Sequence, residues 1–432
     1  MEIIEITILV VSFLILLSVG VPISFSIGIS SLLTMLFSIN TMPSLTTISQ
    51  RMATGLDSFA LLAIPFFILA GQLMNSGGIA RRLIDFAKVL VGKLPGGLAF
   101  VNIMAAMLFG AISGSAVAAA SAIGGFMTPV MKKEGYDEAF SAAVNITSAT
   151  TGLIIPPSNV LIVYSLASGG VSIAALFLAG YIPGILIGLS LMIVAFIHAK
   201  RKNYKVTIDF TFVDAVKRFL DAIPSLLLIF IVIGGIVAGY FTATEASAIA
   251  VLYAFILSVF IYKEIKLADL PKILLSAAST TAIVMLLVGT SMAMSWVMAY
   301  ENIPQNVAAA LLSLSSDKIL IMIIINLILL AVGTFMDMTP AILIFTPIFL
   351  PVAVQLGIDP IHFGIIMVMN LSIGLCTPPV GSVLFVGCSV AGLSIVKVIK
   401  PLLPMFIAMI ISLLLVTYLP ELSLFLPRFF GF

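Results

Sequence analysis

Long apolar stretches alternate with short polar ones along almost the whole chain. A helix needs roughly 17–25 mostly apolar residues to cross the hydrocarbon core of a bilayer. The predicted membrane segments are 3–20, 22–38, 57–75, 95–131, 137–168, 172–198, 224–240, 245–262, 273–299, 318–353, 361–390 and 401–419. This pattern predicts a helical protein that crosses the membrane many times.

Three other stretches, 78–93, 208–222 and 300–315, mix apolar with polar residues and are too polar to cross the bilayer. Amphipathic helices of this kind lie in the membrane interface, with the apolar face turned toward the acyl chains. We therefore expect these stretches to lie at the membrane surface or to brace the bundle.

Two of the membrane segments, 95–131 and 318–353, are too long for one simple span. The first has Gly110-Ala-Ile-Ser-Gly-Ser115 at its middle, and the second has Gly333-Thr-Phe-Met-Asp-Met-Thr-Pro340. Each could be two full spans or one re-entrant hairpin. Irregular backbone at membrane depth must be buried in protein or line a cavity, so small and polar residues at the middle favour hairpins with buried tips.

The distribution of positive charge predicts the orientation of the chain, because cytoplasmic segments of membrane proteins are enriched in Lys and Arg. If both long segments are hairpins and the N-terminus is outside, 17 of the 20 Lys and Arg residues lie on the cytoplasmic side. Only Arg51, Lys318 and Arg428 then lie outside. Both chain termini are predicted to be periplasmic.

The composition excludes several other classes of protein. Apolar residues make up 62% of the 432 residues and charged residues only 9%, which is too few charges for the surface of a soluble protein. The net charge of +2 gives no sign of a nucleic-acid partner. The two cysteines, Cys376 and Cys388, lie within apolar segments, so neither a disulfide framework nor a metal site is indicated.

The two halves of the chain align without gaps at a constant separation of 222 residues. Glycine and proline dominate the matches, and these residue types set the shape of the backbone. The matched pairs are Pro129 with Pro351, Gly135 with Gly357, Gly152 with Gly374, Pro156 with Pro378, Pro157 with Pro379, Gly170 with Gly392, Ser172 with Ser394, and Ile173 with Ile395. We therefore predict an internal repeat.

The predicted first repeat is 1–205, with scaffold spans in 1–75, a hairpin and a broken helix in 95–168, and a span at 172–198. A cytoplasmic amphipathic linker, 206–222, leads to the second repeat, 223–432, with scaffold spans in 224–299, a hairpin and a broken helix in 318–390, and a span at 401–419. Each repeat has an odd number of crossings, so the second is inserted upside down. The predicted fold class is an all-α polytopic membrane protein of two inverted repeats, each with a re-entrant helical hairpin and a broken helix, which is typical of secondary transporters.

Each repeat carries two adjacent prolines in the middle of a span, Pro156-Pro157 and Pro378-Pro379. Proline lacks an N–H and disfavours helical geometry in the residue before it, so both spans are predicted to break there. A break frees carbonyl groups of one half-helix, which suit a hard cation such as sodium, and N–H groups of the next, which attract a carboxylate. The other interpretation is a structural kink whose hydroxyls bond back to their own helix.

The hairpin tips supply further candidates. Ser113 and Ser115 are predicted to face the first break, and Asp337 and Thr339 the second. Asp337 lies deep within an apolar hairpin, where a charge is costly and commonly functional. Ligation of a cation would offset that cost, and a protonated or helix-capping aspartate is the alternative. The polar side chains of the broken-helix motifs are candidates for contacts with the substrate: Asn145, Ser148, Thr151, Asn159, Asn370 and Ser372.

Four motifs resemble the large membrane (M) subunit of tripartite ATP-independent periplasmic (TRAP) transporters. They are Gly152-Leu-Ile-Ile-Pro-Pro-Ser158, Ala63-Ile-Pro-Phe-Phe-Ile-Leu-Ala-Gly71, Gly374 to Gly381, and Gly110 to Ser115. The resemblance covers essentially the whole chain. It implies a multi-pass transporter of the bacterial inner membrane with an elevator mechanism, in which hairpins and broken helices move against a scaffold.

The resemblance also implies partners and ion sites. The partners are a small membrane (Q) subunit, here a separate chain, and a periplasmic substrate-binding (P) protein that delivers an organic anion such as a sialic acid or a dicarboxylate. Sodium ions would drive the transport. The implied sodium sites lie at the hairpin tips and helix breaks: Ser113, Gly114, Ser115, Pro156, Ser158, Asn159, Gly333, Asp337, Thr339, Thr377, Pro378 and Gly381.

Other functions compete with this prediction. A standalone sodium–carboxylate symporter of the same superfamily would work without a binding protein. A membrane-embedded enzyme would need a concentrated catalytic set, but His198 and His362, the two histidines, fall on opposite sides of the membrane in the predicted topology. A channel is the third option, although inverted repeats with broken helices favour alternating access. We therefore predict a transporter and no enzymatic activity.

Overall fold

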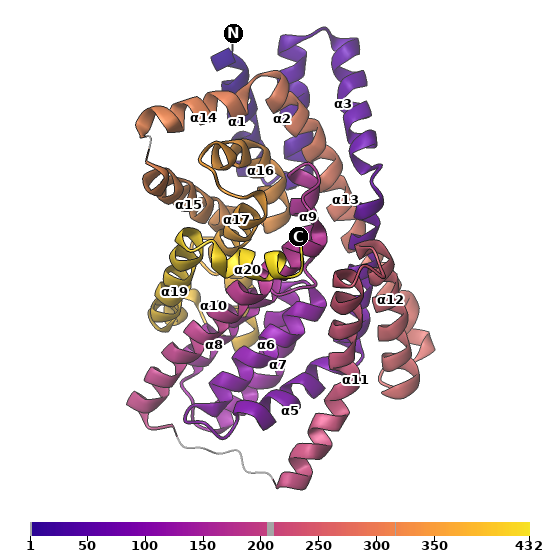
Figure 1. Cartoon of the computed structure of the whole chain (residues 1–432), viewed down its shortest axis with the longest axis vertical. Helices are drawn as coiled ribbons and strands as arrows, with labels where there is room; N and C mark the ends of the chain where they lie inside the picture. The colour runs from indigo at the N-terminus through magenta and orange to yellow at the C-terminus, as the bar shows by residue number, and fades with distance from the viewer. Residues whose placement is uncertain (1, 205–210, 316) are drawn as a thin grey trace.

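The computed structural model describes residues 2–204, 211–315 and 317–432, and this part of the chain is helical and contains no β-strand (Figure 1). Eight helical stretches within it are at least 18 residues long and apolar enough to cross a membrane. Shorter apolar helices accompany them. The predicted all-α, multi-pass architecture is confirmed.

The first helices form a bundle with helices from the middle of the chain. α1 (Glu2–Ser18) and α2 (Ile23–Ser38) pack together, and α3 (Thr41–Leu56) and α4 (Ala63–Ser76) follow them. α2, α3 and α4 all pack against α13 (Leu270–Tyr300), and α4 also packs against α12 (Ala243–Phe255). The apolar pattern does not predict α3, because polar residues interrupt it, and its contacts with α13 hold it in place.

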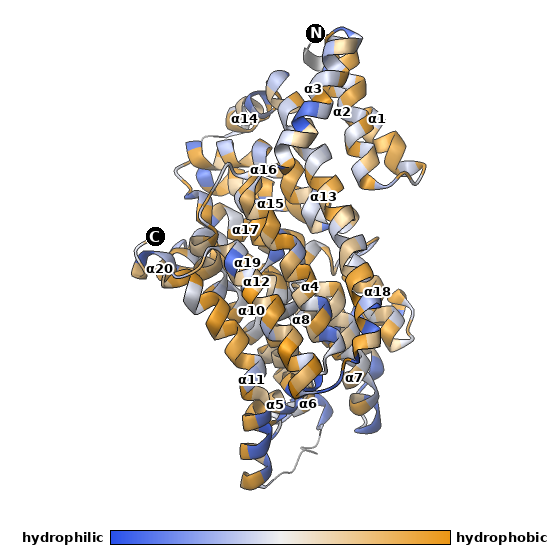
Figure 2. Cartoon of the chain, turned by 90° about the vertical axis from the view of Figure 1, so that its right-hand side faces the viewer, coloured by the Kyte–Doolittle hydropathy of each residue, from blue (hydrophilic) through white to orange (hydrophobic). Residues whose placement is uncertain are grey.

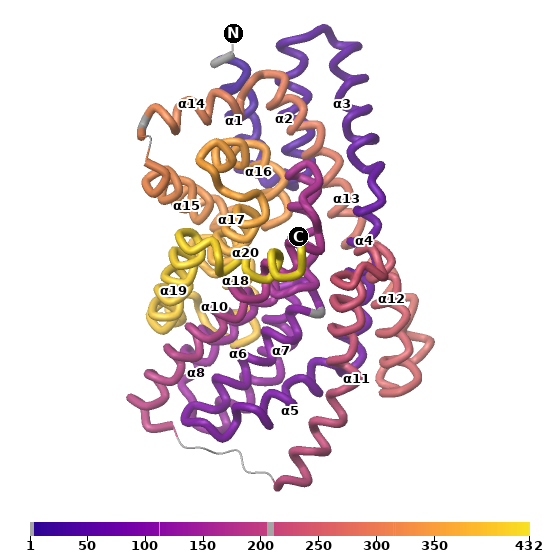
Figure 3. Tube along the Cα trace, in the orientation of Figure 1, coloured from indigo at the N-terminus to yellow at the C-terminus, as the bar shows by residue number. Residues whose placement is uncertain are grey.

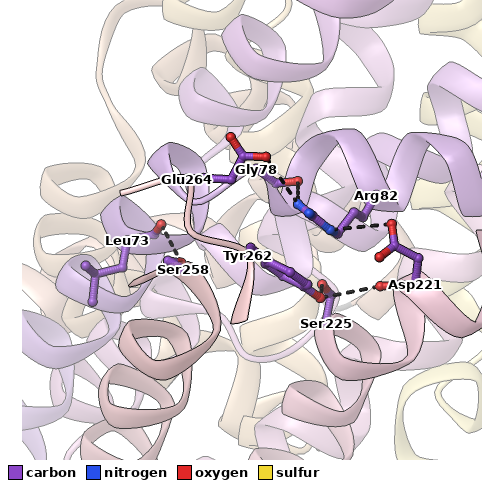
Figure 4. Close-up of polar contacts among 8 residues, drawn as sticks. All are labelled: Leu73, Gly78, Arg82, Asp221, Ser225, Ser258, Tyr262 and Glu264. Atoms are coloured by element: carbon purple, nitrogen blue, oxygen red, sulfur yellow. Dashed lines mark hydrogen bonds and ion pairs between the residues drawn. The ribbon is translucent and has the colours of Figure 1, made fainter. Parts of the chain in front are cut away.

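An anchored bend connects α4 to the amphipathic helix α5 (Ile79–Val91). Gly78 turns the chain there with a left-handed φ of +72°, a conformation that glycine adopts without strain. Arg82 on α5 donates a hydrogen bond of 3.0 Å to the carbonyl of Gly78, and its guanidinium lies 3.6 Å from the ring centroid of Tyr262 (Figure 4). Arg82 also forms a 3.5 Å ion pair with Asp221 on α11 (Phe212–Val237), which ties α5 to the second half of the chain.

Both long segments form two helices joined by a sharp turn. α6 (Gly97–Ser113) and α7 (Ala116–Lys133) form hairpin 1, which turns at Gly114 and Ser115. α15 (Lys318–Phe335) and α16 (Met338–Gln355) form hairpin 2, which turns at Met336 and Asp337. In Figure 1, hairpin 1 lies in the lower half of the molecule and hairpin 2 in the upper half.

Both proline pairs interrupt a helix, as the sequence predicts. In broken helix 1, α8 (Glu138–Ala149) ends in a 3-10 turn, Thr150–Leu153, and α9 (Asn159–Ala167) begins after the prolines. In broken helix 2, α17 (Pro360–Gly374) ends before the prolines and α18 (Ser382–Ala391) begins after them. Both Pro–Pro peptide bonds are cis.

The remaining helices connect and flank these elements. α10 (Ile173–Lys202) follows broken helix 1 and packs against α19 (Ile395–Tyr418) and the C-terminal helix α20 (Glu421–Phe429). α12 continues into a π-helical turn, Ile256–Ile261, and α14 (Ile303–Leu314) precedes hairpin 2. Of the predicted linker, residues 206–210 lie outside the described part of the chain, and from Phe212 it is continuous with α11.

The two ends of the molecule differ in polarity. Figure 3 shows the N-terminus at the end opposite the last turns of α10 and the first turns of α11. Figure 2 shows hydrophilic residues gathered at this second end, around α5, α7 and the start of α11, and hydrophobic residues along the middle of the helices. This is the end to which the charge distribution assigns the cytoplasm.

Helix boundaries recur at the separation found in the sequence. The starting residues of three pairs of helices, α7 and α16, α8 and α17, and α10 and α19, are 222 positions apart: Ala116 and Met338, Glu138 and Pro360, and Ile173 and Ile395. Hairpin, broken helix and following span therefore occur in the same order in both halves.

Glycines let each hairpin touch the broken helix beside it. A Cβ atom on Gly152 of broken helix 1 would lie 2.2 Å from the Cα atom of Gly110 on α6. A Cβ atom on Gly374 of broken helix 2 would lie 2.5 Å from the Cα atom of Gly333 on α15. Because carbon atoms pack at about 3.5–4.0 Å, only glycine allows these backbones to meet. Both hairpin tips are thereby held against the helix breaks.

Candidate substrate and cation site

The tips of both hairpins line one cavity of about 230 Å³. From the sequence, each tip was predicted to face the break of its own repeat. In the structure, both tips line this one cavity. Further walls come from the start of α9, the end of broken helix 2, and the scaffold helices α4 and α13. The polar or charged lining residues are Gln72, Asn75, Ser113, Ser115, Asn159, Thr280, Asp337 and Thr339.

The tip of hairpin 1 is shaped by Gly114. Its φ of +61° lies in the left-handed region, and a Cβ atom there would meet the Nδ2 atom of Asn159 at 3.1 Å. Ser115 caps α7, since its hydroxyl oxygen accepts a hydrogen bond of 3.2 Å from the backbone N–H of Ala118. The buried Ser113 also lines the cavity. The N-terminus of α7 is therefore open toward the cavity.

Asn159 opens α9 and carries a buried side-chain oxygen, Oδ1, that has no hydrogen-bond partner among the described residues. An unpaired buried carbonyl oxygen costs about 1–3 kcal/mol. Asn159 lines the cavity beside the glycine turn of hairpin 1. Its Oδ1 atom is thus available to a ligand, and an oxygen of this kind suits a hard cation.

Asp337 stands at the N-cap position of α16, at the tip of hairpin 2, and its side chain makes no capping hydrogen bond. It is exposed to the cavity, and it forms no salt bridge with any described residue. Thr339 lies beside it in the first turn of α16. A carboxylate without a basic partner in a mostly apolar protein favours a bound cation.

Broken helix 2 is held to hairpin 2 through backbone contacts. The N–H of Gly381 donates a hydrogen bond of 3.1 Å to the carbonyl of Thr334. The hydroxyl of Thr377 donates back to the carbonyl of Ile373 at 2.8 Å. Gly333 packs on broken helix 2, as described above, and Pro378 is exposed. None of these predicted sodium ligands lines the cavity, which broken helix 2 reaches through Leu375.

Two of the residues predicted at the first break are packed inside the protein and do not reach the cavity. Pro156 and Ser158 are buried, and the Ser158 hydroxyl donates a hydrogen bond of 2.5 Å to the carbonyl of Leu153. Neither residue lines the cavity. Of the twelve predicted sodium residues, the structure gathers Ser113, Gly114, Ser115, Asn159, Asp337 and Thr339 around it.

Most predicted substrate residues bond within the helix packing. Asn145 donates to the carbonyl of Ala120 at 2.8 Å, and the hydroxyls of Ser148, Thr151 and Ser372 donate to carbonyls three or four residues earlier. Asn370 donates to the side-chain oxygen of Asn326 on α15 at 2.8 Å. These five residues do not line the cavity, whereas Asn159, the sixth, does.

Three polar residues of the site were missed by the sequence analysis. Gln72 and Asn75 on α4 and Thr280 on α13 face the cavity from the scaffold. Gln72 and Asn75 place amide groups, which both donate and accept hydrogen bonds, inside an otherwise apolar span. This feature of the sequence could have identified them as candidates for the site. Gly71 of the same helix would place a Cβ atom 3.0 Å from the carbonyl oxygen of Ser113, so α4 lies directly on the tip of hairpin 1.

The arrangement can bind an anion and a cation side by side. α7, α9 and α16 all begin at the cavity, and helix N-termini carry partial positive charge and free N–H groups that attract a carboxylate. Asp337 and the Oδ1 atom of Asn159 are hard oxygen ligands that fit sodium. In the described residues, no group of three His, Cys, Asp or Glu side chains could hold a metal ion.

A multi-pass helical fold with paired hairpins and broken helices around one polar cavity is that of a membrane transporter. The crystal structure of the Alcanivorax borkumensis YdaH transporter superposes with a TM-score of 0.64, covering 91% of this chain and 89% of that chain at 13% identity. The structure of MtrF from Neisseria gonorrhoeae, described as one of a class of antimetabolite efflux pumps, superposes with a TM-score of 0.61, covering 86% and 84% at 13% identity. The fold is thus shared with transporters of very different sequence.

The chain belongs to the family described as tripartite ATP-independent periplasmic transporter, DctM component, which matches residues 10–422. It is 60% identical to the protein YgiK of Salmonella typhimurium, covering 97% of this chain and 96% of that one. It is 39% identical to the C4-dicarboxylate TRAP transporter large permease DctM of Rhodobacter capsulatus (96% and 97% covered) and 38% identical to the sialic acid TRAP transporter large permease SiaM of Vibrio cholerae (96% of both). The protein is therefore a TRAP transporter large permease and not an enzyme.

Proposed function

We propose that this subunit imports a small organic carboxylate across the bacterial inner membrane and couples its uptake to sodium. The observation that carries the proposal is the cavity at which Asp337, which has no basic partner among the described residues, the unpaired Oδ1 atom of Asn159 and three helix N-termini converge. The helix N-termini bind the carboxylate of the substrate, and the two side-chain oxygens bind sodium.

The two halves are proposed to be inverted repeats that operate as an elevator. Equal spacing of helix starts supports the repeat, and the hairpins lie in opposite halves of the molecule in Figure 1 while their tips meet at one cavity. Hairpins and broken helices would move together, because backbone contacts at Gly152 and Gly374 join them. α4 and α13 would remain in the scaffold and face the cavity with Gln72, Asn75 and Thr280.

The identity of the anion is proposed at the level of its chemistry. The relatives described above are named for C4-dicarboxylate or sialic acid, and they are almost equally identical to this chain, at 39% and 38%. Both ligands present a carboxylate and differ in the rest of the molecule. We infer that the large permease binds the carboxylate and that a periplasmic binding protein selects the remainder of the substrate.

The proposed assembly contains a separate small membrane subunit and a periplasmic binding protein, with both termini of this chain in the periplasm. A relative from Oleidesulfovibrio alaskensis is named isethionate TRAP transporter permease DctMQ, and this chain covers 65% of it at 41% identity. Its greater length fits a fusion of large and small subunits. The hydrophilic end of the molecule in Figure 2 faces the cytoplasm in this proposal.

Uptake into proteoliposomes tests the proposal. The chain, copurified with its small subunit, is reconstituted and supplied with radiolabelled succinate or N-acetylneuraminate together with the cognate binding protein. We expect uptake to require an inward sodium gradient and the binding protein, and to ignore added ATP. A potassium gradient of equal size is the control.

Two results would contradict the proposal in different ways. Uptake that proceeds at the same rate under the potassium gradient excludes sodium coupling. Uptake by a homodimer of this chain without any binding protein identifies the standalone symporter instead. Asp337→Asn in the same assay then tests whether the cavity described here is the site of coupling.

A further inference from the structure

A second, positively charged pocket lies away from the cavity, between the end of α10 and the start of α19, and encloses about 600 Å³. Its lining contains four cations, Arg201 and Lys202 from α10 and Lys397 and Lys400 from α19. The only acidic side chain of the lining is Asp137, whose Oδ1 atom is already engaged by the backbone N–H of Phe140 at 2.8 Å. The pocket therefore carries a strong excess of positive charge.

These four cations are unpaired within the described part of the chain. None of the four forms a salt bridge with a carboxylate in the part of the chain that the structure describes. His198, which also lines the pocket, stacks on Phe140 at a centroid distance of 3.9 Å. Its buried Nε2 atom has no hydrogen-bond partner among the described residues. Both observations point to an anionic ligand with hydrogen-bonding oxygens.

The floor of the pocket is apolar and continuous with the lipid-facing surface. Val194, Ile197, Pro401, Pro404 and Met405 line it below the cations. Ile193 and Leu403 on the same two helices are 61% and 56% exposed. α10 and α19 are both long and apolar enough to span a membrane, so these exposed side chains meet acyl chains. A ligand that satisfies both parts of the pocket has an anionic head and an apolar tail.

We propose that this pocket binds the headgroup of an anionic phospholipid of the cytoplasmic leaflet. Arg201, Lys202, Lys397 and Lys400 contact the phosphate, and the acyl chains follow the apolar floor into the bilayer. Basic pockets between transmembrane helices on the cytoplasmic side are suited to such headgroups. Because α10 belongs to the first half of the chain and α19 to the second, a lipid bound here would join the two halves of the molecule at this end.

Native mass spectrometry of the purified permease complex tests the proposal. The complex is stripped of lipid in detergent and titrated with phosphatidylglycerol or with phosphatidylcholine. We expect phosphatidylglycerol to remain bound to the wild type and Lys397→Gln/Lys400→Gln to bind it about thirtyfold more weakly, which corresponds to about 2 kcal/mol at about 1 kcal/mol per cation.

A matched control removes the same charge elsewhere. Lys266→Gln/Lys272→Gln neutralises two exposed lysines, one just before α13 and one in its first turn, outside the pocket, and should bind the lipid like the wild type. Lys397→Arg/Lys400→Arg keeps the charge and should also retain binding. If both glutamine variants bound phosphatidylglycerol equally weakly, net charge alone would explain the effect, and the proposed site would be wrong.

A final arm distinguishes the lipid from a soluble anion. Glycerol 3-phosphate and inorganic phosphate carry the anionic group without acyl chains, and we expect neither to displace phosphatidylglycerol or to bind at comparable concentration. Binding of glycerol 3-phosphate as tight as that of the lipid would overturn the lipid proposal. Equal retention of phosphatidylcholine and phosphatidylglycerol would do so as well, because the cations would then contribute nothing.

Discussion

The contact between Gly152 and Gly110 predicts that Gly152→Ala destabilises the protein. The Cβ atom of an alanine at this position would lie 2.2 Å from the Cα atom and 2.6 Å from the carbonyl carbon of Gly110. Carbon atoms pack at about 3.5–4.0 Å, so broken helix 1 and α6 would have to move apart by more than about 1 Å. Neither contacting atom belongs to a flexible side chain that could turn away.

The expected magnitude follows from overpacking. Inserting a methyl group into a close-packed contact costs about 1–3 kcal/mol, and more where backbone must move. The φ angle of Gly152 is not positive, so the substitution adds no conformational strain of its own. Gly374→Ala should cost a similar amount, because its Cβ atom would lie 2.5 Å from the Cα and carbonyl carbon atoms of Gly333.

Thermal unfolding of the detergent-purified protein measures the effect, with Gly125→Ala as the control. Gly125 lies on α7 with no atom within 4 Å of its Cβ position, and alanine there should be neutral or slightly stabilising because of its higher helix propensity. We expect the midpoint of Gly152→Ala to lie several degrees below that of Gly125→Ala. Equal midpoints for the two variants would refute the close contact and, with it, the fixed attachment of hairpin 1 to broken helix 1.

Three further substitutions test the site and the scaffold. Asp337→Asn keeps the size of the side chain and removes its charge, and we expect the sodium concentration for half-maximal uptake to rise at least about tenfold, or about 1.4 kcal/mol. Asn159→Ala removes the free Oδ1 atom and should raise the same sodium concentration by a smaller factor, because a neutral ligand is lost. Arg82→Gln removes the contact with the ring of Tyr262 and should lower the unfolding midpoint by the equivalent of about 1 kcal/mol.

Each of these has its own control. For Asp337→Asn and Asn159→Ala, binding of the substrate-binding protein and the unfolding midpoint should stay close to wild type. If either variant kept the sodium dependence of the wild type, the substituted residue would not be part of the ion site. Arg82 also forms a 3.8 Å ion pair with Glu264, but its two ion pairs contribute little to stability because Asp221 and Glu264 are 59% and 46% exposed. Asp221→Asn should therefore leave the unfolding midpoint close to wild type. A wild-type midpoint for Arg82→Gln would contradict the anchoring role of the ring contact.

The sequence predicts the broken helices well because the cause is local. Each pair of adjacent prolines, Pro156-Pro157 and Pro378-Pro379, removes two backbone N–H groups and disfavours helical geometry in the residue before it. The tip of hairpin 1 was expected within the small-residue cluster Gly110 to Ser115, and the turn falls inside it at Gly114, where the left-handed φ favours glycine. Features that depend on one or two neighbouring residues can be found without a structure.

Features that depend on distant contacts could not be found in this way. α3 is too polar to be predicted as a span, and its packing against α13 holds it in place. Nothing in the sequence states that Ser113 and Asp337, more than two hundred positions apart, share a cavity. Ser148 was predicted from the sequence to contact the substrate, but its hydroxyl donates a hydrogen bond to the carbonyl of Asn145, as hydroxyls inside helices often do.

The shared cavity gives a physical reason for coupling an anion to sodium. In the proposed mode of binding, a space of about 230 Å³ would hold the substrate carboxylate within roughly 8 Å of Asp337, where two negative charges repel by about 2 kcal/mol at an effective dielectric constant of about 20. That repulsion weakens anion binding about thirtyfold, and a sodium ion at Asp337 removes it. The residue of repeat 1 that corresponds to Asp337 is Ser115, so only one hairpin brings a charge. In Asp337→Asn the anion should therefore bind more tightly without sodium than it does in the wild type, and should gain less from sodium.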